Sequence, residues 1–391
     1  MQNIQDSMNL CCIYGTRAVA ENATASVARL LAQLLAGLVR LRSPDWRFEL
    51  VAPAGSQVNG VTCRVPVLSI PKRLKYRLLK RFCGWSESEL WTRKAVAFIA
   101  GSPNGIPDTF LCGTGSAPTL LRQRFPKARI VYWLHNLPKS ARDTLAAVSA
   151  SDALVLPSRA LYDRLWDRFE ADCFPIPVWI LRNWVAPEQF APLANTKRNA
   201  ERQELGLTPT DLVLAHVGGW APNKGLRVLV QGLRQCPPPP GRKVVLLTAS
   251  GATVRTRQTV AAGVDLIEME RLEPSRMNAL FNAADVGVAP SVWFENAPLS
   301  VLEMMATARP VLAAQAGGIP EMVEHGHTGW LVERPNDVAA WVEALQRLYA
   351  LSPAELNAMG EAGRQRTLVQ FAPAAGVAQW TALLENLARH R

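Results

Sequence analysis

The strongest constraint in this sequence is the regular alternation of short apolar runs with longer segments of helical periodicity. Runs such as RFELVAP (47–53), ARIVYWLH (128–135) and KVVLLTAS (243–250) have the length and composition of buried strands. The apolar spacing of intervening segments, for example 24–41, predicts amphipathic helices. Alternation of this kind is typical of parallel sheets that are covered by helices. The sequence therefore predicts an α/β protein.

The predicted strands form two series with a break around 185–208, where strand character is lost and prolines and charges are frequent. A chain of 391 residues also exceeds what one hydrophobic core usually spans. We therefore predict two doubly wound, Rossmann-like domains that face each other across a cleft. Strands are expected at 10–15, 47–53, 109–113, 128–135, 153–158, 178–183, 211–219, 243–250, 264–270, 286–291, 309–314 and 329–332.

The net charge and the cysteine content indicate the kind of partner and the cellular compartment, but not the activity. A formal charge of +11 and a pI of about 9.6 favour an anionic partner: a nucleic acid, a phosphate-bearing ligand or an acidic membrane surface. The seven cysteines form no C-x-x-C pair, and their number is odd, so reduced thiols are favoured over a disulfide framework or a zinc site. The first residues do not have the pattern of a signal peptide, and we expect a cytoplasmic protein.

The stretch FENAPLSVLE (294–303) places two glutamates on either side of a predicted helix start. Pro298 suits the first turn of a helix, so Glu295 should lie in the preceding loop and Glu303 in the second turn. The first-turn N–H groups of Leu299 and Ser300 would then form an anion site between the two acids. A ligand with hydroxyls at both ends and phosphates in the middle matches this arrangement. The alternative is a surface acid followed by a glutamate that the helix dipole stabilises.

The stretch HVGGWAPNKGL (216–226) reads as a strand, a glycine loop and a helix start with a lysine. Gly218 and Gly219 allow close backbone approach, and Lys224 could neutralise a phosphate, although a solvated lysine is the alternative. Leu226 stands where a P-loop would have Ser or Thr, and no G-x-G-x-x-G is present. A P-loop NTPase and a dehydrogenase are therefore disfavoured.

Two stretches, taken in their order along the chain, resemble the C-terminal half of a retaining glycosyltransferase of the family 4 type, which has the GT-B fold. They are HVGGWAPNKGL and ADVGVAPSVWFENAPLSVLEMMATARPVLAAQAGGIPEMVEHGHTGWLV (284–332). The resemblance is dense over 211–335 and thinner before it, where VYWLHN (131–136) is one matching segment. It implies three parts: an acceptor-binding domain at 1–190, a nucleotide-sugar-binding domain at 191–370, and a helix at 371–391 that packs back toward the first domain.

The resemblance also implies roles for individual residues. Glu295 would hold hydroxyls of the donor sugar, Glu303 the ribose of the nucleotide, and Lys224 would neutralise the diphosphate. His135 would face the cleft near the transferred sugar, a core histidine being the alternative, and Gly15 would leave room for acceptor or phosphate. The predicted catalytic residues are Glu295, Lys224 and His135, and the predicted donor-binding residues are Glu303, Gly218, Gly219, Asn296, Leu299, Ser300 and Gly15.

Three departures from the family pattern concern the diphosphate site, the hinge region and the acceptor side, in that order. Gly219 stands where the family has an arginine, for which Arg271 is the candidate replacement. The usual N-G-V-D segment reads Asn183-Trp184-Val185-Ala186, and Gly15-Thr16-Arg17 replaces a glycine pair.

The resemblance implies transfer of a sugar from a nucleotide-diphosphate-sugar to a glycan or lipid-linked acceptor with retention, in cell-surface polysaccharide or lipopolysaccharide synthesis. No Asp-x-Asp motif is present to hold a divalent metal, so we expect metal-independent chemistry without a cofactor. The alternatives are a GT-B sugar-nucleotide epimerase or phosphorylase, which would share the donor site, and a basic scaffold without catalytic activity that associates with membrane or nucleic acid.

The stretch KRLKYRLLKRF (72–82) combines a basic face with an apolar strip of Leu74, Leu78 and Phe82. A helix with these two faces would suit anionic lipid headgroups, and a solvated charge run or a nucleic-acid patch is the alternative. We expect peripheral contact with the inner face of the plasma membrane through this stretch, and no nucleic-acid partner.

Overall fold

The computed structural model divides the chain into two compact units. Unit 1 comprises residues 1–182 and 376–391, and unit 2 comprises residues 183–375. The structure describes residues 8–14, 26–41, 46–65, 87–103, 105–138, 140–169, 174–251 and 253–389.

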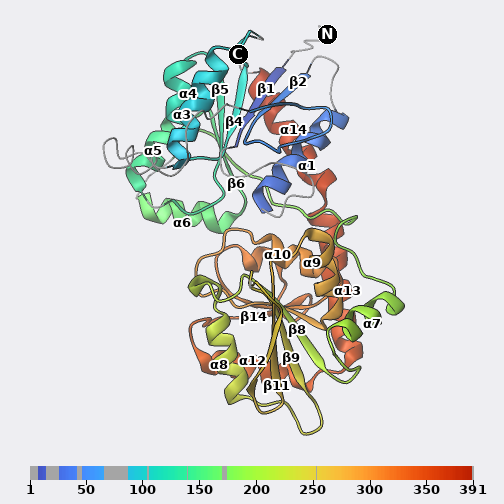
Figure 1. Cartoon of the computed structure of the whole chain (residues 1–391). Helices are drawn as coiled ribbons and strands as arrows, with labels where there is room; N and C mark the ends of the chain where they lie inside the picture. The colour runs from blue at the N-terminus through green and yellow to red at the C-terminus, as the bar shows by residue number, and fades with distance from the viewer. Residues whose placement is uncertain are drawn as a thin grey trace. The chain divides into compact units, whose positions relative to one another are not determined.

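Unit 1 contains a sheet of parallel strands in the order β3-β2-β1-β4-β5-β6-β7 (Figure 1). Its central strands are buried along almost their whole length, as expected where helices cover both faces of a parallel sheet. The strands are β1 (Met8–Ile13), β2 (Trp46–Val51), β3 (Thr62–Arg64), β4 (Thr109–Cys112), β5 (Arg129–Trp133), β6 (Ala153–Leu156) and β7 (Val178–Ile180).

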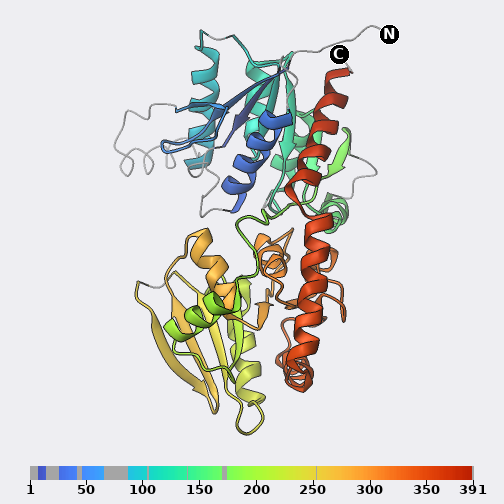
Figure 2. The ribbon, with the colours of Figure 1, turned by 90° about the vertical axis from the view of Figure 1, so that its right-hand side faces the viewer.

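The helices of unit 1 form a layer on each face of this sheet (Figure 1). Helices α3, α4 and α5 lie on one face, and α1 and α14 lie side by side on the other (Figure 2). Close approach of α1 and α14 depends on Gly37, because a Cβ there would lie 2.4 Å from a methyl of Val377. The helices are α1 (Ser26–Leu41), α3 (Glu87–Ala100), α4 (Ala117–Arg124), α5 (Ala141–Ser149), α6 (Arg159–Phe169) and α14 (Pro373–Arg389).

Unit 2 has a second sheet, in the order β10-β11-β9-β8-β12-β13-β14, which is parallel except at one edge. Strand β10 runs antiparallel to β11 and was not predicted, because it is exposed and polar and therefore has no apolar run. The strands are β8 (Leu212–Val217), β9 (Val244–Ala249), β10 (Thr256–Ala261), β11 (Val264–Met269), β12 (Val286–Ala289), β13 (Val311–Ala314) and β14 (Gly329–Val332).

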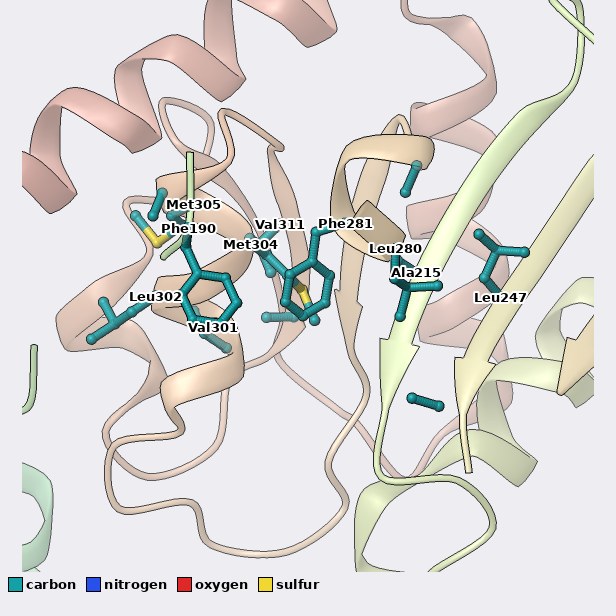
Figure 3. Close-up of a cluster of buried hydrophobic side chains, with 14 of the residues drawn as sticks. Phe190, Ala215, Leu247, Leu280, Phe281, Val301, Leu302, Met304, Met305 and Val311 are labelled. Carbon is teal, nitrogen blue, oxygen red and sulfur yellow. The ribbon is translucent and has the colours of Figure 1, made fainter. Parts of the chain in front are cut away.

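The core of unit 2 lies between the sheet and the helices on its faces. Figure 3 shows part of it, with Phe190 and Phe281 between side chains of α10 and of the strands. The helices are α7 (Asn195–Glu204), the short 3₁₀ helix η1 (Pro222–Lys224), α8 (Leu226–Gln235), α9 (Pro274–Ala283), α10 (Leu299–Ala306), α11 (Ile319–Met322), α12 (Val338–Ala350) and α13 (Pro353–Gln370).

The segment 185–208 is more ordered than its composition suggests, since it contains α7. Arg198 and Arg202 on this helix both bind the carboxylate of Asp285, at 2.6 Å and 3.3 Å. The Arg202 guanidinium is buried and also donates to the main-chain carbonyls of Ala283, Thr208 and Asp211, so its desolvation is offset by hydrogen bonds. Helix α7 is therefore fixed to the body of unit 2.

The structure confirms the prediction of two Rossmann-like α/β domains with parallel sheets. Within the described residues, no helix combines the length and the apolar character needed to cross a membrane. The basic stretch 72–82 lies outside the described residues, so membrane contact through it stays a prediction.

Candidate functional site

Apart from Gly15, the predicted donor-binding residues belong to unit 2 and come from loops and a helix at the carboxyl-terminal edge of its sheet. From β8 the chain passes to β9 on one side and later returns to β12 on the other side of β8. Open α/β sheets bind ligands at such a reversal, because the loops after the two central strands diverge there. In unit 2 these loops are 218–225, which carries Lys224, and 290–298, which carries Glu295.

The two loops are in direct contact. The main-chain N–H of Val292 donates to the carbonyl of Asn223 at 3.1 Å. Gly225 has φ = 68°, and a Cβ on it would lie 1.7 Å from the carbonyl oxygen of Pro290. Only glycine permits this backbone geometry and this approach. The two loops therefore form one surface.

Lys224 and Glu295 form an ion pair on this surface, with Nζ 2.7 Å from Oε1. The stem of Lys224 crosses Gly218, where a Cβ would lie 2.8 Å from its Cγ. Gly218 has φ = 122°, so the local backbone also favours glycine. Of the three predicted catalytic residues, the structure brings these two together.

Two further residues hold the loop of Glu295 through hydrogen bonds, and the sequence analysis assigned no role to either of them. The hydroxyl of Ser291 donates to Glu295 Oε1 at 2.7 Å, and the amide of Asn183 donates to the carbonyl of Ala297 at 2.9 Å. Both side chains are buried. The signals were a hydroxyl four residues before Glu295, and an asparagine that matches the family's residue in a segment altered at its second and fourth positions.

The glycine turn at 317–318 supports the same loop. Gly317 has φ = 56°, and a Cβ there would lie 2.0 Å from the carbonyl oxygen of Glu295. The N–H of Gly318 donates to that oxygen at 2.7 Å. These glycines therefore allow close approach to the main chain of Glu295.

Helix α10 begins at Leu299, one residue later than predicted, and Pro298 is its N-cap with an extended ψ of 117°. Leu299 and Ser300 are its first two residues, and first-turn N–H groups have no acceptor within their own helix. Glu303 lies in the second turn as predicted, with 6% of its surface exposed. Asn296 lies in the loop beside Glu295.

The backbone at Gly219 explains why the family's arginine is absent there. Gly219 has φ = 56°, and a Cβ would lie 2.7 Å from the Cα of Ser250. A side chain at this position would collide with the end of β9. Arg271, the candidate replacement, is exposed in the segment that follows β11.

His216 lies at the end of β8, below the loop that carries Lys224. It is buried, and its Nδ1 lies 2.9 Å from the hydroxyl of Thr248. Burial, together with the charge of Lys224, lowers the pKa of His216 to about 4, so the ring is neutral near pH 7. A neutral imidazole can bind metal, but among the residues that the structure describes no group of three or more His, Cys, Asp or Glu could hold a metal ion.

His135 belongs to unit 1, two residues beyond the end of β5. Its ring centroid lies 4.1 Å from that of Trp133, and burial lowers its pKa to about 3. It lines a pocket of about 740 Å³ in unit 1. Gly15 lies outside the described residues.

Comparisons with known proteins agree with this fold. Residues 211–350 match the family described as "Glycosyl transferases group 1". Alpha-maltose-1-phosphate synthase of Mycolicibacterium smegmatis is 30% identical over 241 residues, which cover 58% of this chain and 60% of the relative. The chain thus spans less than two thirds of that relative.

Two solved structures resemble the chain over almost its full length. Sucrose-phosphate synthase from Thermosynechococcus elongatus has a TM-score of 0.73 at 19% identity, covering 98% of this chain and 100% of the other. Anabaena Alr3699/HepE in complex with UDP and glucose has a TM-score of 0.69 at 16% identity, covering 97% and 100%. The chain therefore has the fold of GT-B glycosyltransferases, and its residues 211–350 are similar to the glycosyl transferases group 1 family.

Proposed function

We propose that the protein is a glycosyltransferase that moves a sugar, with retention, from a nucleotide-diphosphate-sugar to a glycan or lipid-linked acceptor. The observation that carries the proposal is the Lys224–Glu295 pair, which two touching loops hold at the strand reversal of a group 1 domain. A structural relative, Anabaena Alr3699/HepE, was solved in complex with UDP-glucose, a ligand of the proposed donor class.

The two side chains of this pair suit different parts of such a donor. Lys224 uses one of its three N–H groups on Glu295. The others can meet diphosphate oxygens, next to the first-turn N–H groups of α10. Among the described residues, Glu295 Oε2 has no hydrogen-bond partner, so this oxygen can accept from sugar hydroxyls. Glu303, in the second turn of α10, is proposed to bind the ribose.

This arrangement would stabilise the departing nucleotide. Cleavage of the bond between the anomeric carbon and the phosphate leaves negative charge on the diphosphate and positive character on the sugar. Fixed donors aimed at the developing charge lower the barrier. Lys224 and the N–H groups of Leu299 and Ser300 are the proposed donors, and no metal is required for this role. Glu295 orients the sugar and is not proposed as a nucleophile.

Thermal-shift measurements with UDP-, GDP- and ADP-sugars test donor binding, because a ligand that binds only the folded state raises the melting temperature. We expect one sugar nucleotide to stabilise the wild type. Lys224→Met should abolish this stabilisation, and Lys197→Met, an exposed lysine of α7 in the same unit, should preserve it. Equal stabilisation of all three proteins would refute the proposed role of Lys224.

Product analysis with the stabilising donor separates transfer from the competing activities. A transferase needs an added sugar acceptor, an epimerase needs none, and a phosphorylase needs inorganic phosphate. Glu295→Gln should keep the fold and lose most of the turnover. A role in cell-surface polysaccharide or lipopolysaccharide synthesis, and attachment to anionic membrane, stay predictions from the sequence.

A further inference from the structure

Two polar side chains lie side by side in the sheet of unit 2, just before the loop that carries Lys224. His216 on β8 and Thr248 on β9 are partners in the parallel register, and both side chains are buried. The other residues of these two strands are apolar. A buried polar group costs free energy unless it is hydrogen-bonded, so the bonds of this pair must offset the cost of placing it here.

The His216 ring has two hydrogen-bond partners. Its Nδ1 lies 2.9 Å from the hydroxyl oxygen of Thr248. Burial and the charge of Lys224 lower the pKa of the ring, whereas a hydrogen bond to the main chain of Lys224 acts in the opposite direction. A bond with that effect favours the protonated ring, so the ring donates and the carbonyl of Lys224 accepts. A neutral imidazole has one donor nitrogen, and Nδ1 therefore accepts from the Thr248 hydroxyl.

The ion pair with Glu295 does not by itself account for the position of Lys224. The Lys224 side chain is 31% exposed, and a partly exposed ion pair contributes little net free energy. The ammonium also ends a flexible stem of four carbons, which is ordered at an entropic cost. The main-chain N–H of Lys224 donates to the carbonyl of Ala221 at 2.9 Å. The bond from His216 fixes the other main-chain group of the lysine and ties it to the sheet.

We propose that His216 is a positioning residue: its ring fixes the main chain of Lys224, so that the ammonium is held against Glu295 before a donor binds. Thr248 orients the ring for this role. The proposal rests on the transferase function proposed above and adds a residue that acts on the donor only through Lys224. The alternative is a buried histidine that contributes to stability alone.

Two amides at position 216 separate the two hydrogen bonds of the ring. The NH₂ of a glutamine lies about as far from the main chain as the far ring nitrogen, so His216→Gln can still donate to Lys224. An asparagine reaches only as far as Nδ1, so His216→Asn can bond to Thr248 but not to Lys224. Both variants lose the ring, and only His216→Asn loses the bond to Lys224.

Thr248→Val tests the same link without changing His216. Valine has nearly the shape of threonine, so this variant should fold even where His216→Asn does not, but the ring loses the bond that orients it. The matched control is Thr367→Val in α13. Thr367 is also buried, and its hydroxyl donates to the carbonyl of Gly363 in the same helix.

NMR of the Lys224 ammonium tests the proposal on the full chain without a ligand. An ammonium held in an ion pair exchanges its protons with water more slowly than a solvated one, and Lys224→Met identifies its signal. We expect slow exchange in wild type, His216→Gln and Thr367→Val, and clearly faster exchange in His216→Asn and Thr248→Val. Unchanged exchange in Thr248→Val, fast exchange in wild type, or equal acceleration in His216→Gln and His216→Asn would overturn the proposal.

Donor affinity separates this result from a failure of the proposed function. A lysine that is already in place need not be ordered by the ligand, so His216→Asn should weaken binding of the stabilising sugar nucleotide by about tenfold. His216→Gln and Thr367→Val should keep the wild-type affinity, and a loss of affinity in Thr367→Val equal to that in His216→Asn would contradict the proposal. A wild-type protein that binds no sugar nucleotide would refute the transferase proposal, and the ammonium exchange would still decide whether His216 positions Lys224.

Discussion

Glu295 Oε1 accepts from two donors, the Lys224 ammonium and the Ser291 hydroxyl, both at 2.7 Å. These two hydrogen bonds to one oxygen fix the orientation of the carboxylate, and the ammonium also balances its negative charge. Ser291 is buried and therefore cannot turn to solvent when the ammonium engages a phosphate in the proposed donor complex. The orientation of the Glu295 carboxylate then depends on Ser291, which is uncharged.

Ser291→Ala should reduce turnover without removing nucleotide binding. A hydrogen bond to a charged group contributes roughly 1.5–3 kcal/mol, so we expect kcat to fall by about tenfold or more. The affinity for the nucleoside diphosphate without its sugar should stay unchanged, because Lys224 is intact. Steady-state kinetics and calorimetric titration measure the two quantities. Ser275→Ala, on an exposed part of α9, is the control, and equal kcat in both variants would contradict the role of Ser291.

At the scale of elements, the sequence predicted most of the fold, because parallel strands buried on both faces leave continuous apolar runs. It missed β10, which is exposed and polar, and β3, which has three residues. It singled out Lys224 and Glu295, which the structure brings together in an ion pair. It could not reveal the contact of the loops that carry them, since that contact depends on main-chain groups of Asn223 and Val292.

Gly225→Ala tests whether the contact between these loops matters for the donor site. The new Cβ would lie 1.7 Å from the carbonyl oxygen of Pro290, so the loops must separate. The matched control is Gly251→Ala, because Gly251 has a similar positive φ of 78° and no atom within 4 Å of its Cβ. We expect both variants to lose about 1 kcal/mol from backbone strain, and only Gly225→Ala to lose donor binding. Titration of both variants with the stabilising sugar nucleotide measures their donor affinity. An unchanged affinity in Gly225→Ala would show that the contact between the loops is dispensable.

At the scale of the whole molecule, unit 1 is built from two separate stretches of chain. Its second stretch, 376–391, supplies most of α14, whose Trp380 is fully buried and meets Trp133 edge-on at 4.8 Å. Unit 2 is continuous in sequence. The same α14 starts in unit 2, so one helix belongs to both units.

Trp380→Ala should destabilise unit 1 selectively. Truncation of a buried tryptophan costs about 3–5 kcal/mol through lost contacts and the cavity that remains. Differential scanning calorimetry should show an earlier transition for unit 1, and the transition of unit 2 can be recognised by its rise with the donor nucleotide. Gln379→Ala, at the exposed neighbouring position, should leave both transitions in place. A uniform drop of both transitions in Trp380→Ala would show that the units unfold together.

The division of unit 1 across the chain also sets an order of events during translation. Residues 183–375 have all emerged from the ribosome before the segment that begins at Gly376, so unit 2 can fold while unit 1 still lacks its last helix. Until then, the apolar side of α1 around Gly37, which Val377 covers in the finished protein, faces water. The nascent chain should therefore need a chaperone on the surface of α1 around Gly37 until the segment that begins at Gly376 has been synthesised.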